Sequence, residues 1–180
     1  MKPLQLKNIL FVLFALFLSL GLSAFSQGTN PSKSIITGKV IGISDGDTIT
    51  ILVEGHEQYK VRLAAIDCPE KTQAFGNRAK RVLSEKVFGH NVRIENRGKD
   101  QYGRSLGIVM MGNIDINEYM ISQGLAWHYK KYADKQPSEE ADRYSRAEEI
   151  AKQNKKGVWI QENPTPPWQY RTENKTNKTQ

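Results

Sequence analysis

The stretch "SIITGKVIGISDGDTITILVEGHEQYKVRLAAI", residues 34–66, decides the fold class of this 180-residue chain. Its apolar positions are rich in β-branched residues, and they alternate between two faces over 47–53, which is the pattern of a half-buried strand. Two short connections that contain glycine interrupt the stretch, so an antiparallel meander is predicted. Its three strands are expected at 34–43, 47–53 and 57–66.

Helices and further strands follow this meander. Apolar residues at helical spacing over 72–89, closed by Gly89, predict a helix. Three strands, a helix and two more strands favour an α+β, mainly β fold, in which a five-stranded OB-type barrel carries three packed α-helices. The two further strands are expected at 91–96 and 104–111, and the two further helices at 115–123 and 138–155.

The chain ends differ in composition from the middle. Lys2 and Lys7 precede an apolar run at 9–22 and then small residues, which is the order of a secretory signal peptide over 1–26. The alternative is an uncleaved membrane anchor, although the run is shorter than the roughly 20 residues that a spanning helix needs. We therefore expect an exported protein, secreted or periplasmic, without membrane association after signal cleavage. The remaining chain is divided into a flexible segment at 27–34, one barrel domain at 35–168 and a disordered polar tail at 169–180.

Charge and cysteine content narrow the class of function. The formal charge is +7, and it falls to +5 without residues 1–26, which hold two lysines and no acids. A basic exported domain is compatible with a polyanion such as nucleic acid. Cys68 is the single cysteine, so an internal disulfide is excluded. Because it stands between a strand and a proline with no histidine near it in sequence, a buried side chain is favoured over a nucleophile.

Six charged side chains fall at the expected rim of the barrel. Taken singly, each has an ordinary explanation, since Asp-Gly favours a turn and an arginine on a strand is usually solvated. Together they place carboxylates and guanidinium groups at one end of the expected barrel, so that any metal bound by the aspartates would be held jointly with residues distant in sequence. The six are Asp45, Asp47, Arg62, Asp67, Glu70 and Arg104.

With these residues in view, the chain resembles the thermonuclease family, the staphylococcal-nuclease-like secreted phosphodiesterases. The resemblance covers nearly all of residues 35–168 and keeps the order of the family's motifs. It implies a calcium-dependent nuclease that cuts DNA and RNA with little sequence preference and leaves 3′-phosphate ends. The matching pieces are "DGDT" at 45–48, "VRLAAIDCPE" at 61–70, "DQYGRSLG" at 100–107, "INEYMISQGLAW" at 116–127 and "GVWIQENPTPPW" at 157–168.

The resemblance also implies a metal site for Ca²⁺. Asp47 and Asp67 match the carboxylates that hold calcium, and the carbonyl of Cys68 stands where the family uses that of a threonine. Asp45 matches an acid that helps to arrange the water shell of the metal. Calcium is a hard cation that prefers such oxygen ligands.

The catalytic roles are implied in the same way. Arg62 and Arg104 match the two arginines that bind the phosphate, and Glu70 matches the glutamate that activates or orients the attacking water. Guanidinium groups suit this role because they are planar, bidentate and always charged.

The expected nucleotide-binding residues depart from the family pattern. Gln101 takes the place of a lysine beside Tyr102, and the stacking tyrosines must come from "HYKKY" at 128–132. Tyr102, Tyr129 and Tyr132 are therefore the candidates for substrate binding. Both changes affect substrate affinity more than catalysis.

Two classes compete with the nuclease. A non-catalytic OB module that binds single strands would keep the basic surface and the aromatics but has no need for Asp47, Asp67 and Glu70 together. In a structural or adhesive exported domain, the acids would be incidental. We expect DNA and RNA as the substrates of a monomer that needs no obligate protein partner.

Overall fold

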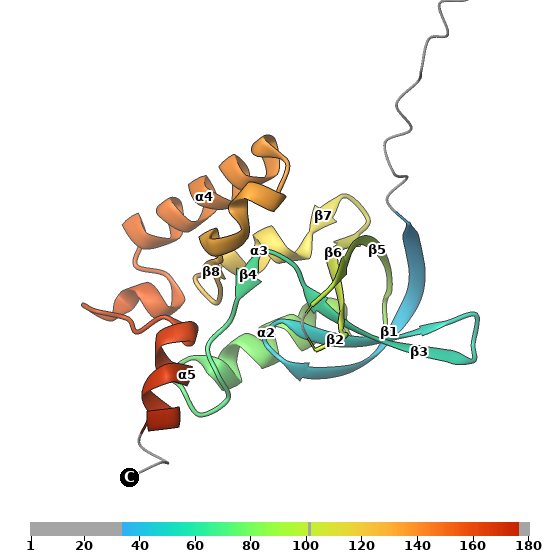
Figure 1. Cartoon of the computed structure of the whole chain (residues 1–180), viewed down its shortest axis with the longest axis horizontal. Coiled ribbons are helices and arrows are strands. Elements are labelled where there is room, and N and C mark those ends of the chain that lie inside the picture. Colours follow the sequence, from blue (N-terminus) through green and yellow to red (C-terminus); the bar gives the residue numbers. More distant parts are fainter. Residues whose placement is uncertain (1–33, 101, 177–180) are drawn as a thin grey trace, which may run out of the picture. The chain divides into compact units, whose positions relative to one another are not determined.

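Five strands form a closed barrel in the computed structural model, which describes residues 34–100 and 102–176 (Figure 1). The sheet order is β3-β2-β1-β5-β6, with β7 (Ile114–Asp115) added beside β6, and a parallel pairing of β3 with β6 closes the barrel. The predicted OB-type barrel is confirmed. Its strands are β1 (Ile35–Asp45), β2 (Thr48–Val53), β3 (Glu57–Leu63), β5 (Asn91–Lys99) and β6 (Ser105–Met111).

Close packing explains where the barrel closes. Ile49, Ile51 and Val61 point inward and are fully buried, as their alternation predicts. At the closure, Leu63 lies opposite Gly107. A Cβ atom on Gly107 would lie 2.4 Å from the Cγ2 atom of Ile94 on β5 and 3.4 Å from the Cγ1 atom of Val61 on β3, so glycine leaves room for these two side chains.

The third strand is shorter than predicted, and this matters for the site. β3 ends at Leu63 instead of continuing to Ile66, because Ala65 adopts a left-handed conformation with φ of 62° and turns the chain out of the barrel. The separate strand β4 (Ile66–Asp67) then pairs with β8 (Trp127–His128). Asp67 is thereby held against the helical part of the molecule.

Three helices lie where the sequence predicts them. They are α2 (Gly76–Val87), α3 (Ile116–Ser122) and α4 (Ser138–Gln153), and two 3-10 turns, η1 (Lys130–Lys135) and η2 (Gly157–Ile160), join them to the rest. α2 begins four residues later than predicted. Phe75 has φ of 68°, and a Cβ atom on Gly76 would overlap the carbonyl oxygen of Glu70, so residues 72–75 form a tight turn before the helix.

A fourth helix, α5 (Pro167–Thr176), replaces most of the expected disordered tail (Figure 1). The three predicted helices are present, and α5 is a further helix over residues for which the sequence predicted a disordered polar tail from 169. Pro167 occupies the first helical position, where its missing N–H costs nothing. The hydroxyl of Tyr170 donates to the carbonyl oxygen of Thr72 at 3.1 Å and fixes the helix beside the barrel.

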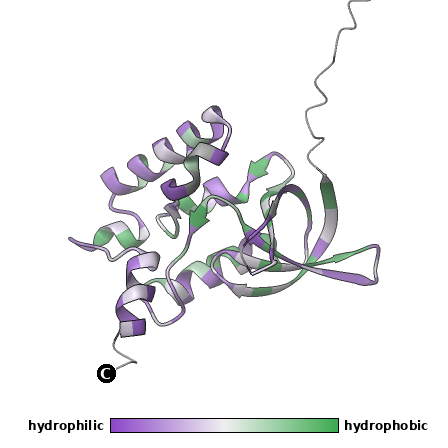
Figure 2. Ribbon diagram, in the orientation of Figure 1, coloured by the Kyte–Doolittle hydropathy of each residue, from purple (hydrophilic) through white to green (hydrophobic). Residues whose placement is uncertain are grey.

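The ends of the chain are described only in part. The predicted signal peptide at 1–26, residues 27–33 and residues 177–180 lie outside the described residues. In the part that is described, no helix has the length and apolar character needed to cross a membrane. Hydrophilic residues dominate α4 and α5, while hydrophobic residues recur along the strands (Figure 2).

Candidate active site

Two of the predicted site carboxylates pair with one arginine at the end of the barrel, and two more lie next to them in the sequence. Arg62 on β3 forms ion pairs with Asp47 and, at 2.9 Å, with Asp67. Asp47 follows the β1–β2 turn, and its backbone N–H donates to Oδ1 of Asp45 at 3.2 Å. Glu70 lies three residues after Asp67 in the sequence. We call Asp45, Asp47, Asp67 and Glu70 the acid cluster.

Backbone hydrogen bonds hold the acid cluster rigidly. Oδ2 of Asp47 accepts a hydrogen bond from the backbone N–H of Cys68 at 3.0 Å, and Oδ1 accepts one from the hydroxyl of Thr48 at 3.1 Å. The first hydrogen bond connects the β1–β2 turn to the segment after β4. Asp47 is 5% exposed and Asp67 is 1% exposed. The sequence separates these two carboxylates by twenty residues, and the fold brings both to Arg62.

The carboxylates of the acid cluster act on each other's protonation. Burial raises the pKa of Asp67, and the charge of Asp47 raises it further, although hydrogen bonds and charge from two arginines oppose this. Burial and the charge of Asp47 also raise the pKa of Asp45. Burial favours a lower pKa for Arg62, but Asp47 and Asp67 outweigh it, so this arginine stays charged. A buried carboxylate whose pKa is raised by burial and by a neighbouring negative charge favours the binding of a cation.

The donor set fits a hard cation rather than zinc. Within the described residues, no three His, Cys, Asp or Glu side chains are grouped so that they could hold a metal by themselves. A cation here would take carboxylate oxygens of Asp47 and Asp67 and complete its shell with a carbonyl and water, which suits calcium. The carbonyl of Cys68 as a ligand stays a prediction.

The thiol of Cys68 is not suited to nucleophilic chemistry. It is buried, it donates to the carbonyl oxygen of Gly46 at 3.1 Å, and burial raises its pKa well above the usual value. A protonated, enclosed thiol is a packing group.

Arg104 lies outside the ion pairs of the acid cluster. It directly precedes β6, the strand that pairs with β3, and Arg62 lies opposite Leu106 in that pairing. Its Nε atom donates to Oδ2 of Asp100 at 2.7 Å, and its guanidinium carbon lies 5.6 Å from the ring centroid of Tyr102. Of the two predicted phosphate-binding arginines, one lies on β3 and the other directly before the neighbouring strand β6, and they bind different carboxylates.

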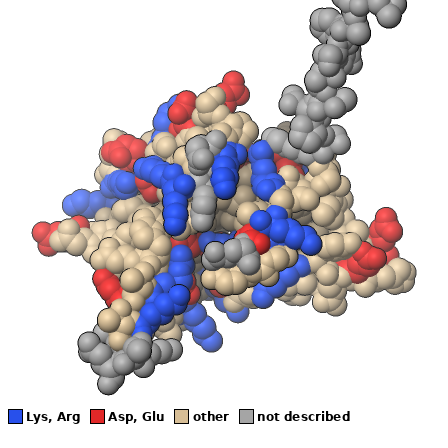
Figure 3. Space-filling view, viewed as in Figure 1, with Lys and Arg blue, Asp and Glu red and all other residues tan. Residues whose placement is uncertain are grey.

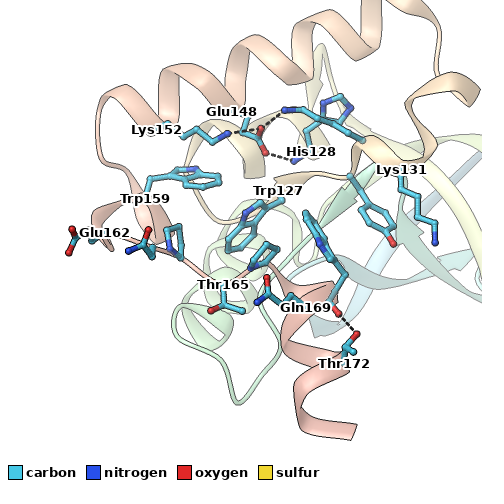
Figure 4. Close-up of a pocket in the computed structure, with 16 residues that line it drawn as sticks. Trp127, His128, Lys131, Glu148, Lys152, Trp159, Glu162, Thr165, Gln169 and Thr172 are labelled. Atoms are coloured by element: carbon cyan, nitrogen blue, oxygen red, sulfur yellow. Dashed lines mark hydrogen bonds and ion pairs between the residues drawn. The ribbon is translucent and has the colours of Figure 1, made fainter. Parts of the chain in front are cut away.

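The structure describes the side chains of two of the three predicted substrate-binding tyrosines, Tyr102 and Tyr129. Tyr102 is 73% exposed beside Arg104. Tyr129 stacks on Trp168 of α5, with ring centroids 5.3 Å apart, at the edge of a cavity of about 960 Å³ that Trp127 and Trp159 also line (Figure 4). The side chain of Tyr132 lies outside the description.

Sequence reasoning missed one residue of the site, Arg171 on α5. Its Nη1 and Nη2 atoms donate to Oδ1 and Oδ2 of Asp67 at 3.2 and 2.8 Å, and Nη1 also donates to Oε1 of Glu70 at 2.7 Å. The available signal was Pro166-Pro167, which can start a helix that carries Arg171. On the face of the molecule seen in Figure 3, Lys and Arg side chains gather, with Asp and Glu side chains among them.

Comparison with known proteins identifies the class. The family described as staphylococcal nuclease homologue matches residues 60–161. An uncharacterized endonuclease of Haemophilus influenzae is 44% identical over 156 residues, which are 87% of this chain and 81% of the relative. A protein of Shigella flexneri named micrococcal nuclease is 36% identical over 158 residues, 82% of this chain and 88% of the relative. Protein ParB of Escherichia coli is 34% identical over 159 residues, 83% of this chain and 86% of the relative.

This chain therefore belongs to the staphylococcal nuclease family, and the predicted family is confirmed. It is a nuclease, and its substrates are nucleic acids. The non-catalytic binding module and the structural domain are thereby set aside.

Proposed function

We propose that this nuclease is calcium-dependent and hydrolyses DNA and RNA without sequence preference, leaving 3′-phosphate ends. The observation that carries the proposal is the acid cluster, in which Asp47 and Asp67 are buried on either side of Arg62 with Glu70 beside them. Two arginines do not compensate the negative charge of four carboxylates, so the acid cluster favours a bound cation. Its carboxylate oxygens are the ligands that a hard cation prefers. When bound, calcium would supply positive charge next to the scissile phosphate.

The side chains divide the chemistry among them. Glu70 takes a proton from the attacking water, whose oxygen forms the new bond to phosphorus. The bond from phosphorus to the 5′ oxygen breaks, and that oxygen takes up a proton from solvent water, so the fragments carry a 3′-phosphate and a 5′-hydroxyl. Asp47, Asp67 and the carbonyl of Cys68 would hold the metal, and Asp45 would orient its water shell.

Two arginines balance the charge that develops on the phosphate. Arg62 is fixed by Asp47 and Asp67, so its position costs no rearrangement during the reaction. Arg104 would release its hydrogen bond to Asp100 and bind the phosphate instead. Tyr102 and Tyr129 would contact the nucleotide, and the basic surface would attract the polyanion without sequence preference. We also propose that the protein works as an exported monomer.

A direct assay tests this function. Plasmid DNA and total RNA are incubated with the protein and calcium, with calcium plus a chelator, and with zinc. We expect degradation with calcium alone, and fragments that a polynucleotide kinase labels at the 5′ end without prior phosphatase treatment. Degradation that persists in the chelator, or 5′ ends that need phosphatase first, would contradict the proposal.

A further inference from the structure

A third arginine enters the site from a part of the chain beyond the family match, which ends at residue 161. Arg171 uses both Nη atoms on Asp67 and one of them on Glu70. Such a bidentate pair with a carboxylate that is 1% exposed is geometrically specific. Asp67 and Glu70 are the carboxylates assigned to the metal and to the attacking water, so one guanidinium connects the two functions.

The helix that carries Arg171 is fixed at three points. The side-chain amide of Gln73 donates to the carbonyl oxygen of Thr165, the hydroxyl of Tyr170 donates to the carbonyl oxygen of Thr72, and Trp168 stacks on Tyr129. The first two contacts reach the loop directly after Glu70. In the same loop, Gln73 accepts a hydrogen bond from the backbone N–H of Glu70 at 3.2 Å. The segment of α5 therefore contacts the loop after Glu70 at Thr72 and Gln73, in addition to the contact that Arg171 makes with the Glu70 side chain.

Arg171 leaves some carboxylate oxygens of Glu70 and Asp67 able to accept further hydrogen bonds or to bind a cation. Oε1 of Glu70 accepts from Arg171, whereas Oε2 accepts no hydrogen bond from the described residues. Oδ2 of Asp67 accepts one hydrogen bond, which leaves one lone pair. The contact therefore orients both carboxylates without consuming either of them.

We propose that Arg171 is a positioning residue of the nuclease, and that it aims Oε2 of Glu70 at the attacking water. This inference rests on the proposed role of Glu70. The side chain of Glu70 is 39% exposed, so without a partner it would sample several rotamers. Misplacement of a catalytic group by about 1 Å can cost about 10²-fold in rate.

A double-mutant cycle tests this role. The variants are Arg171→Gln, Glu70→Gln and the pair, measured with calcium and DNA. We expect Arg171→Gln to lower kcat about 10- to 100-fold with little change in KM, and to add almost nothing in the Glu70→Gln background. Arg171→Lys keeps one charged donor and should recover part of kcat. A wild-type protein without calcium-dependent nuclease activity would refute the proposed function itself rather than this inference.

A second readout is independent of turnover. Calorimetric titration of a nucleoside 3′,5′-bisphosphate at saturating calcium should show no loss of bisphosphate affinity in Arg171→Gln relative to wild type. A large loss of bisphosphate affinity would make Arg171 a phosphate ligand, and a rise in kcat/KM would make α5 an inhibitory element. Either result overturns the proposal. A wild-type kcat in a folded Arg171→Gln protein overturns it as well. Arg143→Gln is the matched control, because Arg143 also bridges two carboxylates, Asp115 and Glu118, outside the acid cluster.

Discussion

Glu148 and the acid cluster have opposite electrostatic characters. Glu148 on α4 accepts hydrogen bonds from the ammonium groups of Lys130 and Lys152 at 2.8 and 3.0 Å and from the backbone N–H of His128 (Figure 4). Burial works to raise the pKa of Glu148, but the two lysines outweigh it, and the pKa is lowered. In the acid cluster, the pKa values of Asp45 and Asp67 are raised.

The negative charge is compensated within the protein at Glu148 but not at the acid cluster. Glu148 is one carboxylate with two cationic partners, so its charge is compensated within the protein. The acid cluster contains four carboxylates, and its members form ion pairs with two arginines, Arg62 and Arg171. The remaining negative charge is the reason to expect a cation and a reaction at the acid cluster, and only a structural role for Glu148.

The largest effect is expected from Glu70→Gln. This change keeps the shape of the side chain but removes the proton acceptor, so kcat should fall by roughly 10²- to 10⁴-fold. The loss should not recover at high calcium, because the role is with water. Steady-state kinetics over a calcium series measures it. Restoration by calcium would reassign Glu70 to the metal, and a near wild-type kcat would remove it from the mechanism.

Asp47→Asn should affect the metal instead. The change removes a negative charge from the acid cluster, so calcium should bind more weakly and activity should recover in part as calcium is raised. Calorimetry and activity at several calcium concentrations measure both effects. Asp142→Asn on the exposed surface of α4 is the control. An unchanged calcium affinity in Asp47→Asn would exclude this carboxylate as a ligand.

Arg104→Lys tests whether geometry matters beyond charge. An ammonium group cannot replace a planar two-pronged donor, so we expect kcat/KM to fall by about 10²-fold. Arg93→Lys, on β5, changes an arginine whose partner is Glu95 and should leave kcat/KM unchanged. Equal kinetics for the two variants would make Arg104 a surface charge.

The smallest effect is expected at the compensated site. Because the pKa of Glu148 is lowered from its ordinary value of 4.5, its ion pairs stabilise the fold above that pH and lose this contribution as the pH falls through the lower folded pKa. Glu148→Gln should lower Tm at pH 7 by about 2–4 °C, corresponding to about 1 kcal/mol. The difference from wild type should shrink in acid, and a difference that stays constant would contradict the assignment.

Local patterns predicted most of the fold, and long-range contacts account for what was missed. The alternation of Ile49 and Ile51 is visible in one strand, so the barrel could be predicted. The turn at Ala65 could not, because its left-handed conformation depends on β4 pairing with β8, some sixty residues later in the chain. α5 was missed because its polar sequence gives a weak helical pattern, and it is fixed by contacts with Thr72 and Gln73.

The same distinction applies to the candidate site. Resemblance to a family gave the residues within its motifs, including Asp47, Arg62 and Asp67, which the structure brings together. It could not give Arg171, which lies after the last of those motifs. It also gave no reason to expect that Arg104 would bind Asp100. In the proposed mechanism, Arg104 would leave that carboxylate to bind the substrate phosphate.

Calorimetric titration of calcium into the wild-type protein, with and without a nucleoside 3′,5′-bisphosphate, tests the central claim most directly. Two carboxylates and a carbonyl make an incomplete set of ligands, so calcium alone should bind weakly. It should bind more tightly when a phosphate is present, and the bisphosphate should gain the same factor from calcium. Equal calcium affinity in both titrations, or no calcium binding in either, would contradict the claim that the acid cluster holds a cation for use with the phosphate.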